Sequence, residues 1–121
     1  MIAGPIAGRI AGAKAQVNGT PYKMHANAPP HSLHSGRDGV NSQHWAVSEH
    51  QPHAITLTLT LKDGACGLPG TRTLSVQYQI VATTLTLTIT TQTDADTLVN
   101  AASHAYWTLD DVGDLLSLIH I

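Results

Sequence analysis

The sequence is poor in charge, in cysteine and in long apolar runs, and each shortage excludes a class of protein. Charged residues make up 12% of the 121 residues, well below the usual quarter. The six Lys and Arg residues are spread along the chain and the formal net charge is −2, so no basic patch exists for nucleic acid or anionic lipid. We therefore expect neither of these partners.

The single cysteine, Cys66, excludes an intrachain disulfide and leaves no Cys pair for a zinc or redox site. One free thiol suits a reducing compartment, so the expected location is the cytoplasm. No apolar run approaches the ~20 residues that a membrane-spanning helix needs. The length fits one domain with its own core, and the sequence predicts a soluble protein without a membrane partner.

Alternating apolar and polar residues indicate three strands in the middle of the chain. Residues 54–61, 73–81 and 84–91 alternate with a period of two, which places their large apolar side chains on one face and mainly Thr, Ser and Gln on the other. Only Ala82 and Thr83 separate the second strand from the third. A tight hairpin should therefore make these two strands antiparallel neighbours.

Turn-forming residues divide the rest of the chain. Residues 62–71 contain Asp-Gly and Pro-Gly pairs and predict an extended turn between the first two strands. The Asn-Gly pair at residues 18–19 predicts a hairpin between residues 9–17 and residues 21–24. Residues 27–41 have loop chemistry throughout, and binding groups usually lie on loops. No segment has a convincing helical pattern, so the predicted class is all-β and antiparallel.

Eight histidines are a high count for this length, and imidazole exchanges protons near neutral pH. His31 and His34 could be imagined as metal ligands, but there is no HExxH motif, no Cys pair and no nearby carboxylate except Asp38. We therefore predict no metal site. Four other histidines, which lie among polar residues near predicted turns or strand ends, are expected to be solvated and without a role: His25, His44, His50 and His53.

Four segments carry motifs that occur in the same order in one known family. Residues 8–14 read GRIAGAK, residues 31–36 read HSLHSG, residues 63–70 read DGACGLPG and residues 99–109 read VNAASHAYWTL. In that order they resemble the Asn-Arg-Ile-Ala segment, the Asn-x-Leu-His-Gly-Gly loop, the Asp-Gly-x-x-Gly-Phe-Pro-Gly turn and the Val-Asn-x-x-x-His-x-Tyr-Phe/Trp-Asn-Leu strand of the aldose 1-epimerases (galactose mutarotases). The resemblance covers nearly the whole chain.

The resemblance implies an antiparallel β-sandwich of the galactose mutarotase-like supersandwich type and an isomerase that needs no cofactor. Its substrate would be a free hexose, whose ring opens at the anomeric carbon and closes on the other face. By the resemblance, His104 is the acid that protonates the ring oxygen, and His34 lies beside that oxygen and orients it. Arg9 corresponds to the arginine that contacts sugar hydroxyls. Tyr106 and Trp107 would form either a wall of the pocket or part of the core.

The sequence also departs from the family pattern. Gly8, Ser35 and Thr108 replace residues that are Asn, Gly and Asn in the family motifs. The family's general base, a Glu, and its substrate-binding Asp come from sequence beyond the last motif, and the single Glu of this chain, Glu49, matches no catalytic motif. We therefore expect a fragment that is inactive alone.

The expected organisation follows from these departures. Residues 1–115 are predicted to form the N-terminal part of a single, truncated mutarotase-like domain. Residues 116–121 match the peptide that a sequencing-library transposon end encodes, and they are predicted to be a non-native tail.

Two other functions stay open. A non-catalytic carbohydrate-binding β-sandwich would use the same Thr-rich strands and polar loops without an acid and a base. A relative that acts on hexose 6-phosphates would need additional basic residues aimed at the phosphate. Arg9, Arg37 and Arg72 are too few and too scattered to favour that alternative.

Overall fold

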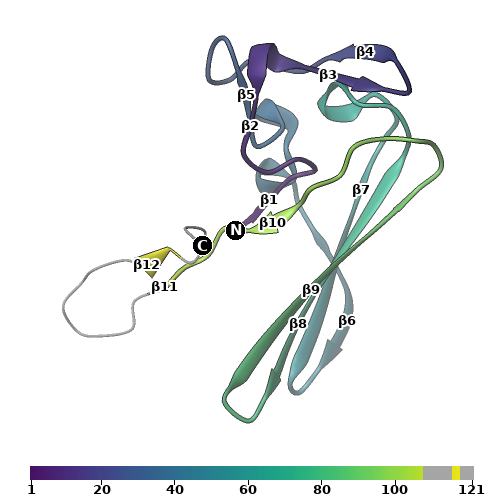
Figure 1. Ribbon diagram of the computed structural model, residues 1–121. Coiled ribbons are helices and arrows are strands. Elements are labelled where there is room, and N and C mark those ends of the chain that lie inside the picture. Colours follow the sequence, from purple (N-terminus) through teal and green to yellow (C-terminus); the bar gives the residue numbers. More distant parts are fainter. Residues whose placement is uncertain (108–115, 118–121) are drawn as a thin grey trace.

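The computed structural model describes residues 1–107 and 116–117, and it is built mainly of β-strands (Figure 1). Helical structure in the described residues is limited to short 3-10 turns. The predicted all-β class is confirmed. In chain order the elements are β1 (Ile2–Ala3), β2 (Arg9–Ile10), η1 (Ala11–Ala13), β3 (Lys14–Val17), β4 (Thr20–Lys23), β5 (Ser32–Leu33), η2 (Gly36–Asp38), η3 (Val40–Ser42), β6 (Ala46–Gln51), β7 (Ala54–Leu61), η4 (Ala65–Gly67), β8 (Arg72–Val81), β9 (Thr84–Thr93), β10 (Ala102–Ser103), β11 (Tyr106–Trp107) and β12 (Leu116–Ser117).

The predicted tail falls largely outside the described residues. Of residues 116–121, only the backbone of β12 is described, and it pairs with β11. The boundary after residue 115 therefore stays a prediction. No helix among the described residues is long and apolar enough to cross a membrane.

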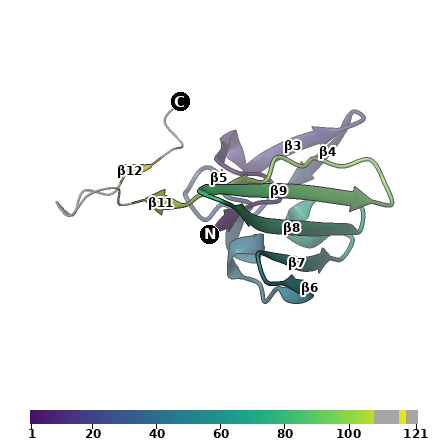
Figure 2. The ribbon, with the colours of Figure 1, turned by 90° about the horizontal axis from the view of Figure 1, so that it is seen from below.

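The largest element is a four-stranded antiparallel sheet in the order β6-β7-β8-β9 (Figure 2). The three predicted strands are confirmed, because β7 has the predicted bounds and β8 and β9 are one and two residues longer. The hairpin between β8 and β9 turns through Ala82 and Thr83, with Ala82 at a φ of 52°. Strict alternation over a half-buried sheet explains why these strands were recognisable.

Strand β6 was not predicted. All six of its residues are exposed, and its register with β7 shifts between Val47 and Glu49, as at a β-bulge. An edge strand without a buried face has no need of alternating side chains, so its sequence carries no period-two signal. Glu49 lies on this exposed strand, as a solvated charge would.

One end of the sheet carries the main core. Leu74 and Val76 of β8 are fully buried, and they pack with Ile2 and Val40 in one cluster. At the other end the same sheet face is open, and the β8–β9 turn projects away from β1–β5 (Figure 1). The core therefore lies where the N-terminal segments cross the sheet.

The turn before β8 is organised around a buried arginine. Arg72 is fully buried; its Nη2 donates to the carbonyl oxygen of Ala65 (2.8 Å) and its Nε to that of Gly70 (3.1 Å). Asp63 accepts a hydrogen bond from the amide of Gly70 at 2.6 Å. The predicted extended turn is present. Arg72 is not exposed to solvent and stabilises this turn through its hydrogen bonds.

Short two-stranded ribbons bring distant segments of the chain together. β3 and β4 form the predicted hairpin, in which Asn18 (φ 50°) and Gly19 (φ 78°) adopt the positive φ angles of a type I′ turn. β2 pairs with β5, and β1 pairs with β10. Because β1 and β10 are about one hundred residues apart, this last ribbon joins the two ends of the described segment 1–107.

Candidate active site

His34 follows β5 and is held by the backbone of Gly8, which precedes β2. The amide of His34 donates to the carbonyl oxygen of Gly8 (2.9 Å), and the amide of Gly8 donates to Nδ1 of His34 (3.0 Å). β5 is itself fixed by Asn27, whose side chain both donates to and accepts from the backbone of Leu33. The imidazole therefore has a defined position on the surface of this ribbon.

The loop that carries His34 has an unusual backbone. His34, Ser35 and Gly36 all have positive φ angles, of 49°, 67° and 81°, which residues other than glycine seldom adopt. The buried hydroxyl of Ser35 accepts from the amide of Ile6 (2.8 Å) and donates to the Ile6 carbonyl (3.1 Å). A side chain at Gly36 would come within 2.9 Å of the Cβ of His25. Tertiary contacts thus hold the loop.

The hydrogen bond from Gly8 also fixes the protonation of His34. A backbone N–H can only donate, so Nδ1 of His34 must be the unprotonated nitrogen and the neutral ring carries its proton on Nε2. Partial burial lowers the pKa of His34, and the positive charges of His104 and Arg9 lower it further. His34 is therefore a neutral hydrogen-bond donor at neutral pH.

His104 reaches the same place from the other end of the described segment. It follows β10, which is paired with β1, and its amide donates to the carbonyl oxygen of Met1 (2.8 Å). Its ring centroid lies 5.2 Å from that of His34, and the two planes are nearly perpendicular at 87°. Nδ1 of His104 is buried and has no partner among the described residues. The other ring nitrogen, Nε2, is thus the one available to a ligand.

Tyr106 and Arg9 border the two imidazoles. The ring of Tyr106 lies 5.3 Å from that of His104 and is 54% exposed, and Trp107 is also exposed. Of the two alternatives for this aromatic pair, a core position is therefore wrong. Arg9 is exposed in β2 opposite Leu33, and its charge acts on His34. The structure places His34 and His104 close together, and it places Arg9 in the strand that pairs with β5 directly before His34.

Comparison with known proteins identifies the family. The family model described as aldose 1-epimerase matches residues 1–118. The chain belongs to the aldose 1-epimerase family.

Several relatives and solved structures of the family resemble the chain. It is 30% identical to an aldose 1-epimerase of Haemophilus influenzae (89% of this chain, 32% of the relative) and 32% identical to a maltose epimerase of Levilactobacillus brevis (93% and 34%). A GalM/aldose epimerase homologue from C. elegans superposes with a TM-score of 0.85 at 30% identity, over 90% of this chain and 34% of that one. The chain thus spans about a third of the length of these relatives.

Three carboxylates of the described residues accept hydrogen bonds away from the two histidines. Asp63 accepts from Gly70, and Asp94 accepts from the amide of Thr71 at 2.7 Å. Asp96 accepts from Asn18 at 2.7 Å. In the part of the chain that the structure describes, no three His, Cys, Asp or Glu residues gather as a metal site would require. The two charges that act on His34 are both positive.

Some residues that build the candidate site were not found from the sequence. Gly8 and Ser35 counted only as departures from the family motifs, yet Gly8 orients His34 and Ser35 anchors its loop. Asn27, which fixes β5, was read only as part of a loop. These residues act through backbone groups of distant segments, and no local pattern reveals such contacts.

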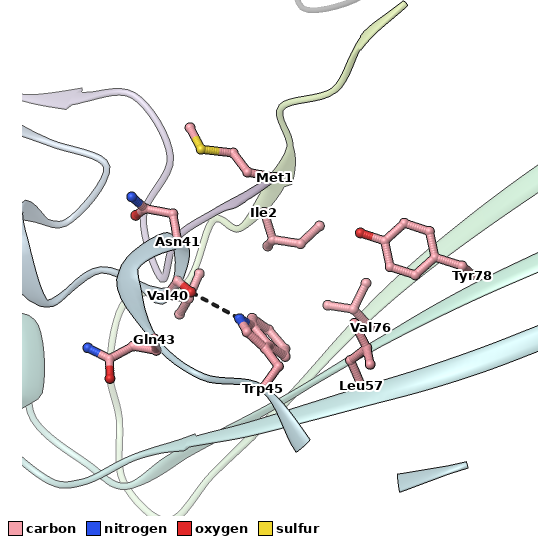
Figure 3. A pocket seen from close by; sticks show the side chains of 9 residues that line it. All are labelled: Met1, Ile2, Val40, Asn41, Gln43, Trp45, Leu57, Val76 and Tyr78. Carbon is pink, nitrogen blue, oxygen red and sulfur yellow. Dashed lines mark hydrogen bonds between the residues drawn. The ribbon is translucent and has the colours of Figure 1, made fainter. Parts of the chain in front are cut away.

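A separate cavity of about 210 Å³ lies on the apolar face of the sheet (Figure 3). The indole Nε1 of Trp45 donates to the carbonyl oxygen of Val40 at 3.0 Å, and burial raises the pKa of Tyr78. Its lining contains neither of the two paired histidines. The cavity extends the main core rather than the candidate site. Its lining residues are Met1, Ile2, Val40, Asn41, Gln43, Trp45, Leu57, Val76 and Tyr78.

Proposed function

We propose that this chain carries the acid side of an aldose 1-epimerase site, which interconverts the α and β anomers of a free hexose. The observation that supports the proposal is the pair of imidazoles, His34 and His104, at 5.2 Å in an edge-to-face arrangement. They come from segments about seventy residues apart and are fixed by backbone hydrogen bonds. Two imidazoles fixed this close together can both act on the ring oxygen of the sugar, one by donating a hydrogen bond and the other by transferring a proton.

In this mechanism the two histidines have different roles. His34 is neutral and donates from Nε2, so it orients the ring oxygen without giving up its proton. His104 is the general acid and transfers a proton to that oxygen as the ring opens. Two imidazolium ions at this distance would repel one another, and the lowered pKa of His34 disfavours a doubly protonated pair.

The remaining roles fall to an arginine and to a carboxylate. Arg9 lies in β2, opposite Leu33 of β5, and offers a fork of donors for sugar hydroxyls. A base must also remove the proton of the C1 hydroxyl, and the carboxylates Asp63, Asp94 and Asp96 hold other hydrogen bonds. By resemblance to the family, whose base is a Glu from sequence beyond the last motif, we place the base beyond these 121 residues, so the chain should be inactive alone.

The proposed substrate is a sugar with a free anomeric carbon. Relatives are named for galactose and for maltose, which both have such a carbon. The proposal includes no metal and no cofactor, because acid and base groups suffice for ring opening. A cytoplasmic location, inferred from the single thiol, is part of the same proposal.

The test restores the missing part of the site. A chimera would join residues 1–107 to the C-terminal part of the Haemophilus influenzae relative, and polarimetry would follow the equilibration of freshly dissolved α-D-galactose. We expect the chimera to accelerate equilibration and the 121-residue chain not to differ from buffer. Replacing His104 by Ala should slow the chimera by about 10²-fold or more, because a general acid contributes about 10²–10⁴.

His53→Ala is the matched control, because His53 is an exposed histidine in the turn between β6 and β7. It should leave the rate of the chimera unchanged. A chimera that is folded by circular dichroism and binds galactose without accelerating equilibration would favour the non-catalytic carbohydrate-binding alternative. Full activity in the His104→Ala chimera would refute the role of His104.

A further inference from the structure

The strand that carries Arg9 is short, and its two ends are held in the same way. β2 and β5 pair over only two residues each. At one end the amide of Gly8 donates to Nδ1 of His34 (3.0 Å), and at the other end the amide of Gly12 donates to Nδ1 of His31 (3.2 Å). His31 directly precedes β5 and His34 directly follows it. Arg9 therefore lies between two backbone amides that are each hydrogen-bonded to an imidazole flanking β5.

The turn before β5 places His31 for this bond. The amide of His31 donates to the carbonyl oxygen of Ala28 (2.8 Å), and the amide of Ala28 donates to the carbonyl oxygen of His31 (3.1 Å). The ribbon of β2 and β5 ends at Ile10 and Ser32, so the amide of Gly12 lies beyond the last backbone pair. A backbone N–H needs an acceptor, and here a side chain supplies it.

The same bond fixes the protonation of His31. Because the N–H of Gly12 can only donate, Nδ1 of His31 must be unprotonated, and the neutral ring carries its proton on Nε2. A second proton, on Nδ1, would bring two donors together and break the bond. Residues 8–14 and 25–36, which meet here, contain no Asp or Glu to stabilise a charged imidazole. Their titratable side chains are Arg9, Lys14, His25, His31 and His34.

We propose that His31 is a positioning residue of the candidate site, which holds β2 at Gly12 and thereby fixes Arg9 relative to His34. The inference rests on the proposed function, in which Arg9 binds sugar hydroxyls. A two-residue ribbon that is released at one end can shift, and a shift of about 1 Å in a binding group is enough to weaken its contacts. Sugar hydroxyls that do not react are bound equally in the ground state and the transition state, so the loss should appear in KM rather than in kcat.

Two substitutions separate the hydrogen bond from the bulk of the ring. In His31→Asn the atom Oδ1 takes the place of Nδ1, since both atoms are bonded to Cγ, and it accepts a hydrogen bond without titrating. His31→Leu retains an apolar side chain of similar reach and has no acceptor. The matched control is His53→Leu, because His53 is exposed in the turn between β6 and β7.

NMR of the 121-residue chain tests the bond without any activity. Imidazole ¹⁵N spectra at pH 7.5 should show His31 with its proton on Nε2, and the amide proton of Gly12 should shift with the same midpoint as the ring of His31. At pH 7.5 that amide should exchange with solvent about tenfold faster in His31→Leu, which loses one hydrogen bond, and within about threefold of the wild type in His31→Asn. A proton on Nδ1 of His31, or a Gly12 amide that does not follow the ring, would overturn the proposal whether or not His31→Leu folds.

Kinetics of the chimera test what the bond does for the site. His31→Leu should raise KM for galactose by about three- to tenfold and change kcat by less than about twofold. His31→Asn should keep both constants within about twofold of the wild type, because its acceptor replaces Nδ1. Between pH 7.5 and pH 5.5, KM should rise more in the wild type than in His31→Asn, since only the imidazole loses its acceptor on protonation. His53→Leu should behave as the wild type.

The outcomes distinguish this inference from the proposed function. A folded but inactive wild-type chimera would refute the proposed function, and the NMR of Gly12 would still decide whether His31 holds β2. In an active chimera, a His31→Leu variant with a lower kcat and an unchanged KM would indicate a loss of folded enzyme and would refute the positioning of Arg9. A His31→Asn variant as impaired as His31→Leu would refute it as well.

Discussion

His34 exchanges two hydrogen bonds with a single residue, Gly8, and these fix both where the imidazole lies and which nitrogen carries its proton. The arrangement uses only backbone groups of Gly8, whose φ of 80° favours glycine at this position. A histidine held in this way donates from Nε2 and resists a second proton. His104 is then left as the imidazole that can deliver one.

The protonation of His34 predicts how acid affects stability. Its pKa is lowered in the folded chain, first by burial and then by the charges of His104 and Arg9. As the pH falls below the ordinary value of 6.5, the unfolded chain takes up a proton before the folded chain does. The contribution of His34 to the free energy of unfolding is therefore complete above that pH and decreases below it, down to the folded pKa.

Denaturant unfolding of the wild type and of His34→Asn at pH 7.5 and pH 5.5 measures this contribution. Asparagine tolerates a positive φ and retains an acceptor for the Gly8 amide. We expect the wild type to lose more stability between the two values than the variant does. Equal losses, or an NMR titration of His34 with a midpoint above 6.5, would contradict the prediction.

The pairing of His34 with His104 could be expected only through resemblance to a family. Nothing in the local sequence of either residue indicates the other, because the contact depends on the two-residue ribbons β1–β10 and β2–β5. Such short ribbons carry no periodic signal. Ser35 shows the same limit, because its role is to satisfy both backbone groups of Ile6, which lies 29 residues away.

At the scale of elements, the turn between β7 and β8 connects the sheet to the loop of His34. Arg72 holds the carbonyl oxygens of the turn, and Cys66 within it donates its thiol to the carbonyl oxygen of Asp38 (3.2 Å), at the end of η2. Burial raises the pKa of the Cys66 thiol to about 11, so it stays protonated as this donor requires. η2 begins at Gly36, the last of the three positive-φ residues of the loop.

Alanine substitutions at two glycines of this turn distinguish the cost of a left-handed backbone from the cost of a steric overlap. Gly64 (φ 79°) and Gly67 (φ 75°) both have left-handed angles, but a Cβ on Gly64 would meet open space, whereas one on Gly67 would overlap the carbonyl oxygen of Lys23. Gly64→Ala should cost about 1–2 kcal/mol, the usual penalty of that conformation. Gly67→Ala should cost at least about 2 kcal/mol more, because backbone must move. Urea unfolding at pH 7.5 gives both values, and similar costs would show that the contact with Lys23 is easily relieved.

The elements that the sequence predicted share one property, which is a buried face or a defined turn. β7, β8 and β9 alternate because one side of each faces apolar neighbours, and the β3–β4 hairpin follows from its Asn-Gly turn. All six residues of β6 are exposed, and the sequence did not reveal it, whereas β9 was predicted with only partly buried residues on its apolar face. A face that is at least partly buried thus marks the strands that local patterns can predict.

At the scale of the whole molecule, the core is confined to one end of the sheet, and the same packing assembles the site. Ile2 of β1 and Val40 of η3 cover Leu74 and Val76, and the pairing of β1 with β10 places His104 at its position. Formation of the site should therefore require the global fold. The opposite end of the sheet contributes little to that fold.

Two leucines on the same sheet face test this division. Leu74 is fully buried in the main cluster, so Leu74→Ala should lower the free energy of unfolding by about 2–5 kcal/mol. Leu85 is 43% exposed at the far end of β9, so Leu85→Ala should cost less than about 1 kcal/mol. Urea unfolding of both variants at pH 7.5 measures the two losses, and an equal loss in both would show that the core extends along the whole sheet.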